Sequence, residues 1–104
     1  MSANNSLSGA DVLVQVLVEK SVKKIFAITG AGNLAIIDAI AREDSIELIY
    51  AHHEQAAVME AQGYSRVTGD IGVALVTTGG GTSNVTTGVL SAHLDSIPLV
   101  LISG

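Results

Sequence analysis

Glu54 is the residue of this chain whose type and position are best suited to chemistry. It follows His52 and His53 at the point where a short apolar strand, residues 46–49, leads into an alanine-rich helix. A glutamate in the first helical turn faces the positive end of the helix dipole, which stabilises it by about 0.3–1 kcal/mol. Such a side chain can also be aimed at a ligand, because ligands bind at the carboxyl ends of strands in open α/β sheets. Spacing alone favours the structural role.

The histidines beside Glu54 offer a second kind of chemistry. His53 is a candidate for proton transfer, since histidine is the side chain that most often acts as a general base. A histidine pair next to a helix start is as often packed or solvated, so this alternative stays open. The spacing of His52, His53 and His93 fits no known metal-ligand pattern, and the sequence therefore predicts no metal site.

Composition narrows the classes of function. The 104 residues allow one domain, and 48% of them are hydrophobic while 14% are charged, which suggests that part of the surface meets another chain or domain. Five Lys and Arg against ten Asp and Glu give a net charge of −5, so we expect no nucleic-acid partner. With no cysteine, disulfides and thiolate metal sites are excluded, and a reducing compartment is favoured.

The two ends of the chain give three expectations. Residues 1–9 lack the basic and apolar parts of a signal peptide, and the longest apolar run, residues 98–102, is far shorter than a membrane span. We therefore expect a cytoplasmic protein with no membrane partner, in which residues 1–6 are disordered or extended and residues 7–104 form the domain. The strand at the end needs cover from further chain, so we expect an incomplete domain from the front of a longer protein.

Strand and helix patterns alternate along the chain. Ser8 is a good N-cap, with Asp11 placed for a capping box, and Asn33 is expected to cap the second helix. Strands are predicted at residues 25–28, 46–49, 71–77 and 99–102, and helices at residues 8–20, 33–41, 53–66 and 79–93. This alternation predicts an α/β fold, a parallel sheet with right-handed connections and helices on both faces.

Two glycine-rich turns suggest other ligands. Gly30-Ala31-Gly32 fits the dinucleotide fingerprint, with Glu54 about twenty residues further on, so a Rossmann-type domain is an alternative. Against it, Glu54 lies past the tip of the second strand, and a helix precedes the first strand. The turn at residues 77–84, TTGGGTSN, resembles an anion cradle but lacks the lysine of a P-loop, which favours a tight packing turn.

These turns and the Glu54 segment occur in one familiar order. The stretch HHEQAA at residues 52–57 is followed by AQGYSR at 61–66, then by TTGGGTSN at 77–84 and DSIPLVLISG at 95–104. Together they resemble R-H-E-q-x-A, A-x-G-Y-A-R, T-x-G-P-G-x-x-N and D-S-x-P-l-v-x-i-x-G. The chain, from Leu7 onward, resembles the N-terminal pyrimidine-binding domain of thiamine-diphosphate enzymes of the acetolactate synthase and pyruvate oxidase type.

The resemblance implies a flavodoxin-like fold that binds thiamine diphosphate, with Glu54 activating the cofactor through its aminopyrimidine ring and His53 as a second candidate for catalysis. The residues implied to line the pyrimidine pocket are Thr29, Gly30, Glu54, Thr77, Gly80 and Asn84. Magnesium and the diphosphate would be held by a domain absent from this chain, so the chain alone should be inactive. The substrate would be a 2-oxo acid, and the chain would self-associate as a homodimer or homotetramer that shares the cofactor between subunits or domains.

Two departures from the family pattern leave the subgroup open. Thr29 and Gly80 stand where proline is usual, so both turns should be looser. Synthase, decarboxylase and oxidase chemistry all remain alternatives, and so does the presence of a flavin such as FAD. A non-catalytic dimerisation module is a further alternative, although such a module has no need of an acid at Glu54.

Overall fold

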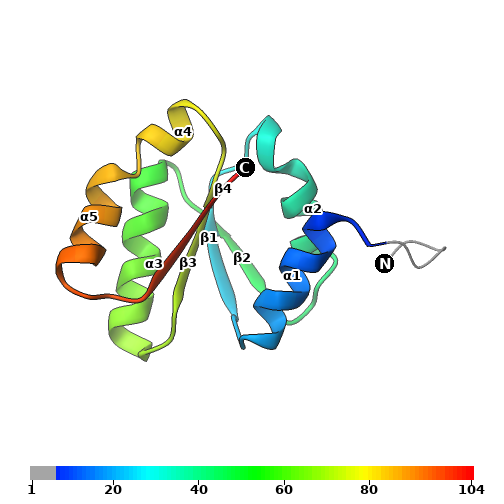
Figure 1. Cartoon of the computed structure of the whole chain (residues 1–104), viewed down its shortest axis with the longest axis horizontal. Helices are drawn as coiled ribbons and strands as arrows, with labels where there is room; N and C mark the ends of the chain where they lie inside the picture. Colours follow the sequence, from blue (N-terminus) through cyan, green and yellow to red (C-terminus); the bar gives the residue numbers. More distant parts are fainter. Residues whose placement is uncertain (1–6) are drawn as a thin grey trace.

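The computed structural model describes residues 7–104, so the prediction made for residues 1–6 lies outside the described residues. Four strands alternate with helices along the chain (Figure 1). The strands are β1 (Lys24–Ala27), β2 (Glu47–Tyr50), β3 (Gly72–Val76) and β4 (Leu99–Ser103). The helices are α1 (Gly9–Glu19), the 3₁₀ turn η1 (Ala31–Asn33), α2 (Leu34–Ala41), α3 (Glu54–Thr68), α4 (Gly80–Ser83) and α5 (Thr86–Leu94).

The strands form one sheet in the order β2-β1-β3-β4, and every pairing is parallel. Helices α1 and α2 cover one face, and α3 and α5 cover the other (Figure 1). The α2 connection runs from β1 towards one edge, whereas α3 and α5 carry the chain the other way. Right-handed connections that travel in opposite directions must lie on opposite faces, as these do. The predicted α/β fold with helices on both faces is confirmed.

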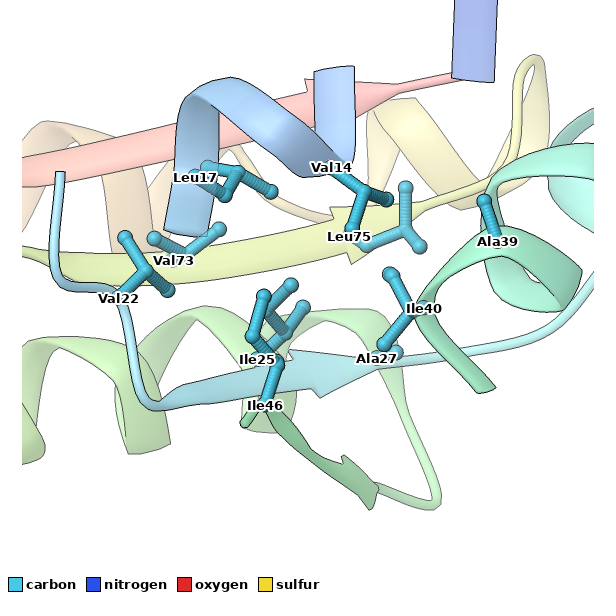
Figure 2. Packing of buried hydrophobic residues seen from close by; sticks show 10 residues of the cluster. All are labelled: Val14, Leu17, Val22, Ile25, Ala27, Ala39, Ile40, Ile46, Val73 and Leu75. Atoms are coloured by element: carbon cyan, nitrogen blue, oxygen red, sulfur yellow. The ribbon is translucent and has the colours of Figure 1, made fainter. Parts of the chain in front are cut away.

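The sheet face under α1 and α2 holds one of two apolar clusters (Figure 2). Alternate strand residues point to this face, because side chains in a strand alternate between the two sides. Ile25 and Ala27 of β1 and Val73 and Leu75 of β3 are all completely buried. The helices add Val14, Leu17, Ala39 and Ile40 to the same cluster. All five residues of β3 are buried, as expected for a central strand that is covered on both sides.

The opposite face depends on close packing between α3 and α5. Small side chains of α3, Ala57 and Ala61, are completely buried there. Gly88 of α5 lies against Val58, so a Cβ atom at Gly88 would be 2.7 Å from Val58 Cγ1. The buried amide of Gln62 donates to Ser91 Oγ across the same interface at 3.2 Å. The alanines of α3 also bring it close to the sheet, since a Cβ atom at Gly72 of β3 would be 2.2 Å from the carbonyl oxygen of Ala61.

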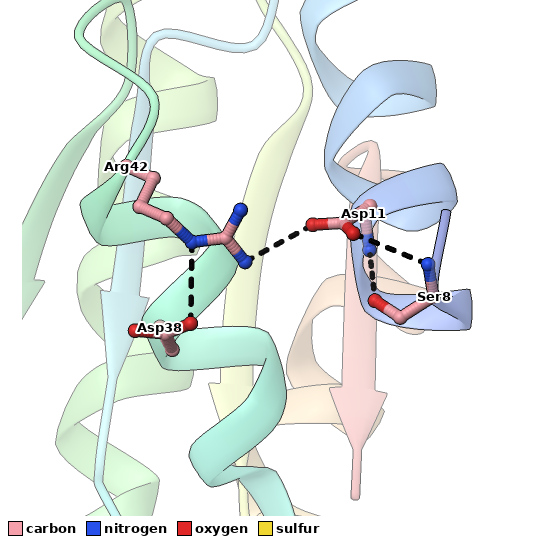
Figure 3. A network of polar contacts seen from close by, with 4 residues as sticks. All are labelled: Ser8, Asp11, Asp38 and Arg42. Atoms are coloured by element: carbon pink, nitrogen blue, oxygen red, sulfur yellow. Dashed lines mark hydrogen bonds and ion pairs between the residues drawn. The ribbon is translucent and has the colours of Figure 1, made fainter. Parts of the chain in front are cut away.

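The start of α1 is fixed as predicted and is also linked to α2 (Figure 3). Ser8 Oγ accepts a hydrogen bond from the backbone N–H of Asp11, and Asp11 accepts one from the N–H of Ser8, both at 3.1 Å. The second oxygen of Asp11 accepts from Arg42 at 3.0 Å, and Arg42 also binds Asp38 at 3.2 Å. One aspartate thus caps α1 and joins it to the end of α2.

Two sequence predictions need correction. The helix expected over residues 79–93 is two helices, α4 and α5, because the N–H of Asn84 bonds to carbonyls three and two residues back and closes the first helix after one turn. Asn33 does not cap α2 through its side chain. That side chain is fully buried, accepts from Gly30 N–H at 3.1 Å and donates to the Ile28 carbonyl at 3.0 Å. Asn33 instead fixes the turn after β1, where buried polar atoms need partners.

Candidate functional site

The strand order places a ligand-binding position at the carboxyl ends of β1 and β3. The chain leaves β1 towards β2 and leaves β3 towards β4, so the loops after these two neighbouring strands diverge. In open α/β sheets this reversal point is where a crevice forms and where ligands bind. The order 2-1-3-4 is that of flavodoxin-like sheets rather than that of the dinucleotide-binding fold. The candidate site is therefore built from the loops that follow β1 and β3.

Gly30 and Thr77 bring these two loops into contact. The φ angle of Gly30 is −167°, an extended value open to any residue, so the need for glycine is one of space. A Cβ atom at Gly30 would be 2.5 Å from Thr77 Cβ, and one at Gly32 would be 2.6 Å from the carbonyl oxygen of Gly104. The glycines of the apparent dinucleotide fingerprint thus serve packing between loops, which removes the support for that alternative. Thr29 is exposed beside them.

The triple glycine forms the other wall of the site. Gly79 has a φ of 73°, in the left-handed region that favours glycine, and this reverses the chain into α4. Gly80 is exposed, and its carbonyl accepts from Ser83 Oγ at 3.0 Å. Gly81 is buried between two site residues, since its Cβ atom would be 3.0 Å from Thr77 Cγ2 and 3.5 Å from Glu54 Oε2. The missing side chain keeps the carboxylate of Glu54 close to the end of β3.

Glu54 is the first residue of α3, directly after the loop that follows β2. Its Oε1 accepts a hydrogen bond from Nδ2 of Asn84 at 3.1 Å, across thirty residues of sequence. The Asn84 amide lowers the pKa of Glu54 below its ordinary value of 4.5, and the backbone N–H of Glu54 adds to this effect. Desolvation acts in the opposite direction but is weaker. Hydrogen bonding therefore favours the ionised form of Glu54.

His53 has a structural role that was not evident from the sequence. It is the N-cap of α3, and its Nδ1 accepts from the backbone N–H of Gln55 at 3.1 Å. Serine, threonine, aspartate and asparagine are the usual N-cap residues, so composition gives little sign of a histidine cap. With Nδ1 acting as an acceptor, a neutral His53 carries its proton on Nε2. Only Nε2 is then left for contact with a ligand.

The structure brings together most of the residues singled out in the sequence. Glu54, Asn84, Thr77 and Gly30 are joined in one line of contacts through Gly81, while Thr29 and Gly80 lie in the same two loops. Sequence reasoning missed Gly81 and Thr82. The hydroxyl of Thr82 donates to the Thr77 carbonyl at 2.9 Å and also bonds to Ser103 Oγ, which ties α4 to the ends of β3 and β4. Membership in the glycine-turn motif is the signal that could have found both.

Two other kinds of site are absent from residues 7–104, a metal-binding cluster and a membrane-spanning helix. Within that range no three His, Asp or Glu side chains come together in a group that could hold a metal ion. None of the helices described for the chain has the length and apolar character needed to cross a membrane. The candidate site thus consists of one carboxylate, one amide, hydroxyls and bare glycine backbone.

This arrangement defines a flavodoxin-like α/β domain with a carboxylate at the reversal point of its sheet. Residues 7–104 match the family model of the thiamine pyrophosphate enzyme, N-terminal TPP binding domain, and the chain belongs to that family. It is 46% identical over 98 residues to the acetolactate synthase isozyme 3 large subunit of Escherichia coli and 49% identical over 98 residues to the acetolactate synthase large subunit of Haemophilus influenzae. Over 96 residues it is 41% identical to the chloroplastic acetolactate synthase of Arabidopsis thaliana.

These alignments cover nearly all of this chain and a small part of each relative. The two bacterial matches span 94% of the chain and 17% of the relative, and the plant match spans 92% and 14%. The resemblance inferred from the sequence motifs is confirmed at the level of the family.

Proposed function

We propose that this chain is the pyrimidine-binding part of a thiamine-diphosphate-dependent enzyme that acts on 2-oxo acids in the manner of acetolactate synthase. The observation that carries the proposal is the carboxylate of Glu54, held beside Gly81 and Thr77 at the reversal point of the sheet. Family membership and the acetolactate synthase relatives support the same class of cofactor and chemistry. A domain that only mediates dimerisation has no need of this carboxylate.

The residues present fit an aminopyrimidine ring. A carboxylate is a pure acceptor and suits a protonated ring nitrogen. Gly80 has no atom within 4 Å of its Cβ position, so a flat ring can approach its backbone closely. Thr29, Thr77 and Asn84 supply polar groups around the same loops. When bound, thiamine diphosphate supplies the electron sink that stabilises a carbanion after decarboxylation. The fit is to the pyrimidine end of the cofactor.

Glu54 has one chemical task in this proposal, to share a proton with the ring nitrogen that it faces. Its pKa is lowered in the free chain, so it starts as the anion and accepts a hydrogen bond from a protonated ring. His53 is a second proton carrier only through Nε2, because Nδ1 caps α3. Any role of His53 in proton transfer is therefore limited to the Nε2 side of its imidazole ring, away from Gln55.

The remaining parts of the enzyme lie outside this chain in our proposal. Magnesium and the diphosphate are held by another domain. The site is completed by a second subunit or domain, and the exposed carboxyl edge of the sheet leaves room for it. The assembled enzyme is a cytoplasmic homodimer or homotetramer. In this proposal, residues outside this chain determine whether the reaction is that of a synthase, a decarboxylase or an oxidase, and whether FAD is used.

The test compares Glu54→Gln with Glu60→Gln in the full-length polypeptide that contains this chain. Glu60 is an exposed glutamate further along α3. Its change to Gln removes one negative charge from the same helix, as Glu54→Gln does. Turnover of a 2-oxo acid should fall roughly 10²–10⁴-fold in Glu54→Gln, the range typical for loss of a proton-transfer group. It should stay unchanged in Glu60→Gln. Near-normal turnover of Glu54→Gln contradicts the assigned role, and the chain of 104 residues alone should give no turnover.

A further inference from the structure

The hydrogen bond between Asn84 and Glu54 divides the two carboxylate oxygens into different roles. Oε1 accepts from Asn84 Nδ2 at 3.1 Å. Oε2 lies towards the glycine turn, where a Cβ atom at Gly81 would be 3.5 Å away. The same Cβ position is 3.0 Å from Thr77 Cγ2, so Oε2 faces the end of β3. Oε1 thus holds the Asn84 amide, and Oε2 lies on the side of the glycine turn at residues 79–81.

The side chain of Asn84 is not needed for the structure of its own turn. Asn84 is the C-cap residue of α4, and that cap is made by its backbone N–H, which bonds to the carbonyls of Gly81 and Thr82. A substitution at Asn84 can therefore remove the amide and keep the backbone cap. The amide nitrogen faces Glu54 because an ionised carboxylate accepts hydrogen bonds only.

We propose that Asn84 is a positioning residue that holds Oε1 of Glu54 and presents Oε2 to the pyrimidine ring. The inference rests on the proposed function. A protonated carboxyl has one O–H donor and one acceptor oxygen, and the N–H of Asn84 requires Oε1 to remain an acceptor. A proton shared with a ligand must then sit on Oε2. Asn84 thereby fixes which oxygen exchanges the proton, without itself touching the reacting atoms.

The residues around Glu54 make this role specific to Asn84. The electrostatic effect of His53 also lowers the pKa of Glu54, but less than the hydrogen bond from Asn84 does. Glu54 N–H also favours the anion but belongs to the backbone of α3, so no substitution of a neighbouring side chain removes it. Loss of the Asn84 amide is thus the change expected to affect Glu54 most.

The test measures the titration of Glu54 directly. The 104-residue chain contains five glutamates, so the carboxyl signal of Glu54 can be assigned by carbon-13 NMR from its absence in Glu54→Gln. The pKa of Glu54 should rise in Asn84→Ala, where the donor is lost, and rise further in Asn84→Asp, where an acceptor of the same shape replaces it. Ser83→Ala is the matched control in the same turn, since Ser83 Oγ bonds to the Gly80 carbonyl. An unchanged pKa in Asn84→Ala and Asn84→Asp overturns the inference.

A second readout separates this inference from the proposed function. In the full-length polypeptide, Asn84→Ala should weaken binding of thiamine diphosphate roughly tenfold, the usual effect of losing one hydrogen bond to a charged group. If the pKa of Glu54 shifts but the unmodified polypeptide binds no thiamine diphosphate, the hydrogen bond from Asn84 to Glu54 stands. The proposed function then fails, and with it the presentation of Oε2 to a pyrimidine ring. If thiamine diphosphate binds equally to both and the pKa is unchanged, the proposed function stands and Asn84 has no positioning role.

Discussion

The glycines of this site matter because a larger side chain would not fit there or could not adopt the backbone angle. Gly30 and Gly81 both lie against Thr77, and a methyl group at either would have to displace it. Gly79 is required for a different reason, its positive φ. Glu54 is kept next to these glycines by the amide of Asn84. The candidate site is therefore a small set of polar atoms over bare backbone.

Gly30→Ala should destabilise the chain by about 1–3 kcal/mol, because overpacking forces neighbouring side chains out of place. Its Cβ atom would be within 2.5–2.7 Å of three atoms of Thr77. Gly63→Ala is the matched control, since nothing lies within 4 Å of its Cβ position in α3 and alanine favours helix by about 0.5–1 kcal/mol. Urea unfolding measures both. Equal stability of the two variants contradicts the packing role given to Gly30.

Helices and strands place the site through their ends and their mutual packing. The capping box at Ser8 fixes where α1 begins, and Arg42 joins that start to α2 (Figure 3). On the other face, α3 must lie close to α5 for Glu54 and the α4–α5 segment to meet. The contact between Gly88 and Val58 sets that distance. Positioning of Glu54 against Asn84 therefore depends on helix packing four residues further along each segment, at Val58 and Gly88.

Gly88→Ala should destabilise by about 1–3 kcal/mol although alanine is the better helix former, because its Cβ atom would be 2.7 Å from Val58 Cγ1. Val58→Ala creates room at the same place. The double variant should therefore lose less stability than the sum of the two single variants, with a coupling of roughly 0.5–3 kcal/mol. Unfolding midpoints of the four proteins measure this. Strict additivity contradicts direct contact between the helices at this point.

At the scale of the whole molecule, burial differs between the centre of the sheet and its edges. The central strands β1 and β3 are covered on both faces, whereas β4 is an outer strand with partly exposed Val100 and Leu101. The net charge is −5, and two of the ten carboxylates, Asp11 and Glu54, have lowered pKa values through hydrogen bonds. The free energy of unfolding should accordingly change with pH in the acid range.

The free energy of unfolding should fall as the pH drops below about 4.5. Backbone N–H of Ser8 and the Arg42 guanidinium lower the pKa of Asp11 from its ordinary 3.8, and Asn84 lowers that of Glu54 from 4.5. A group whose pKa is lower in the folded state contributes stability that is present above its ordinary value and is lost as pH falls through the folded value. Asp11→Asn should therefore flatten the fall, as measured by urea unfolding between pH 3 and 7. An unchanged slope contradicts the native partners assigned to Asp11.

The sequence by itself determined the family, the α/β class and the position of Glu54 at a helix start, because motif order, apolar runs and turn residues are local properties of the chain. It also predicted the Ser8 capping box, which needs only four consecutive residues. Tertiary structure alone decided the break between α4 and α5, the buried role of Asn33 and the N-cap role of His53. The pairing of Asn84 with Glu54 spans thirty residues and exists only because α3 and α5 pack on the same face of the sheet. Contacts of that kind depend on distances between elements, and no local pattern encodes them.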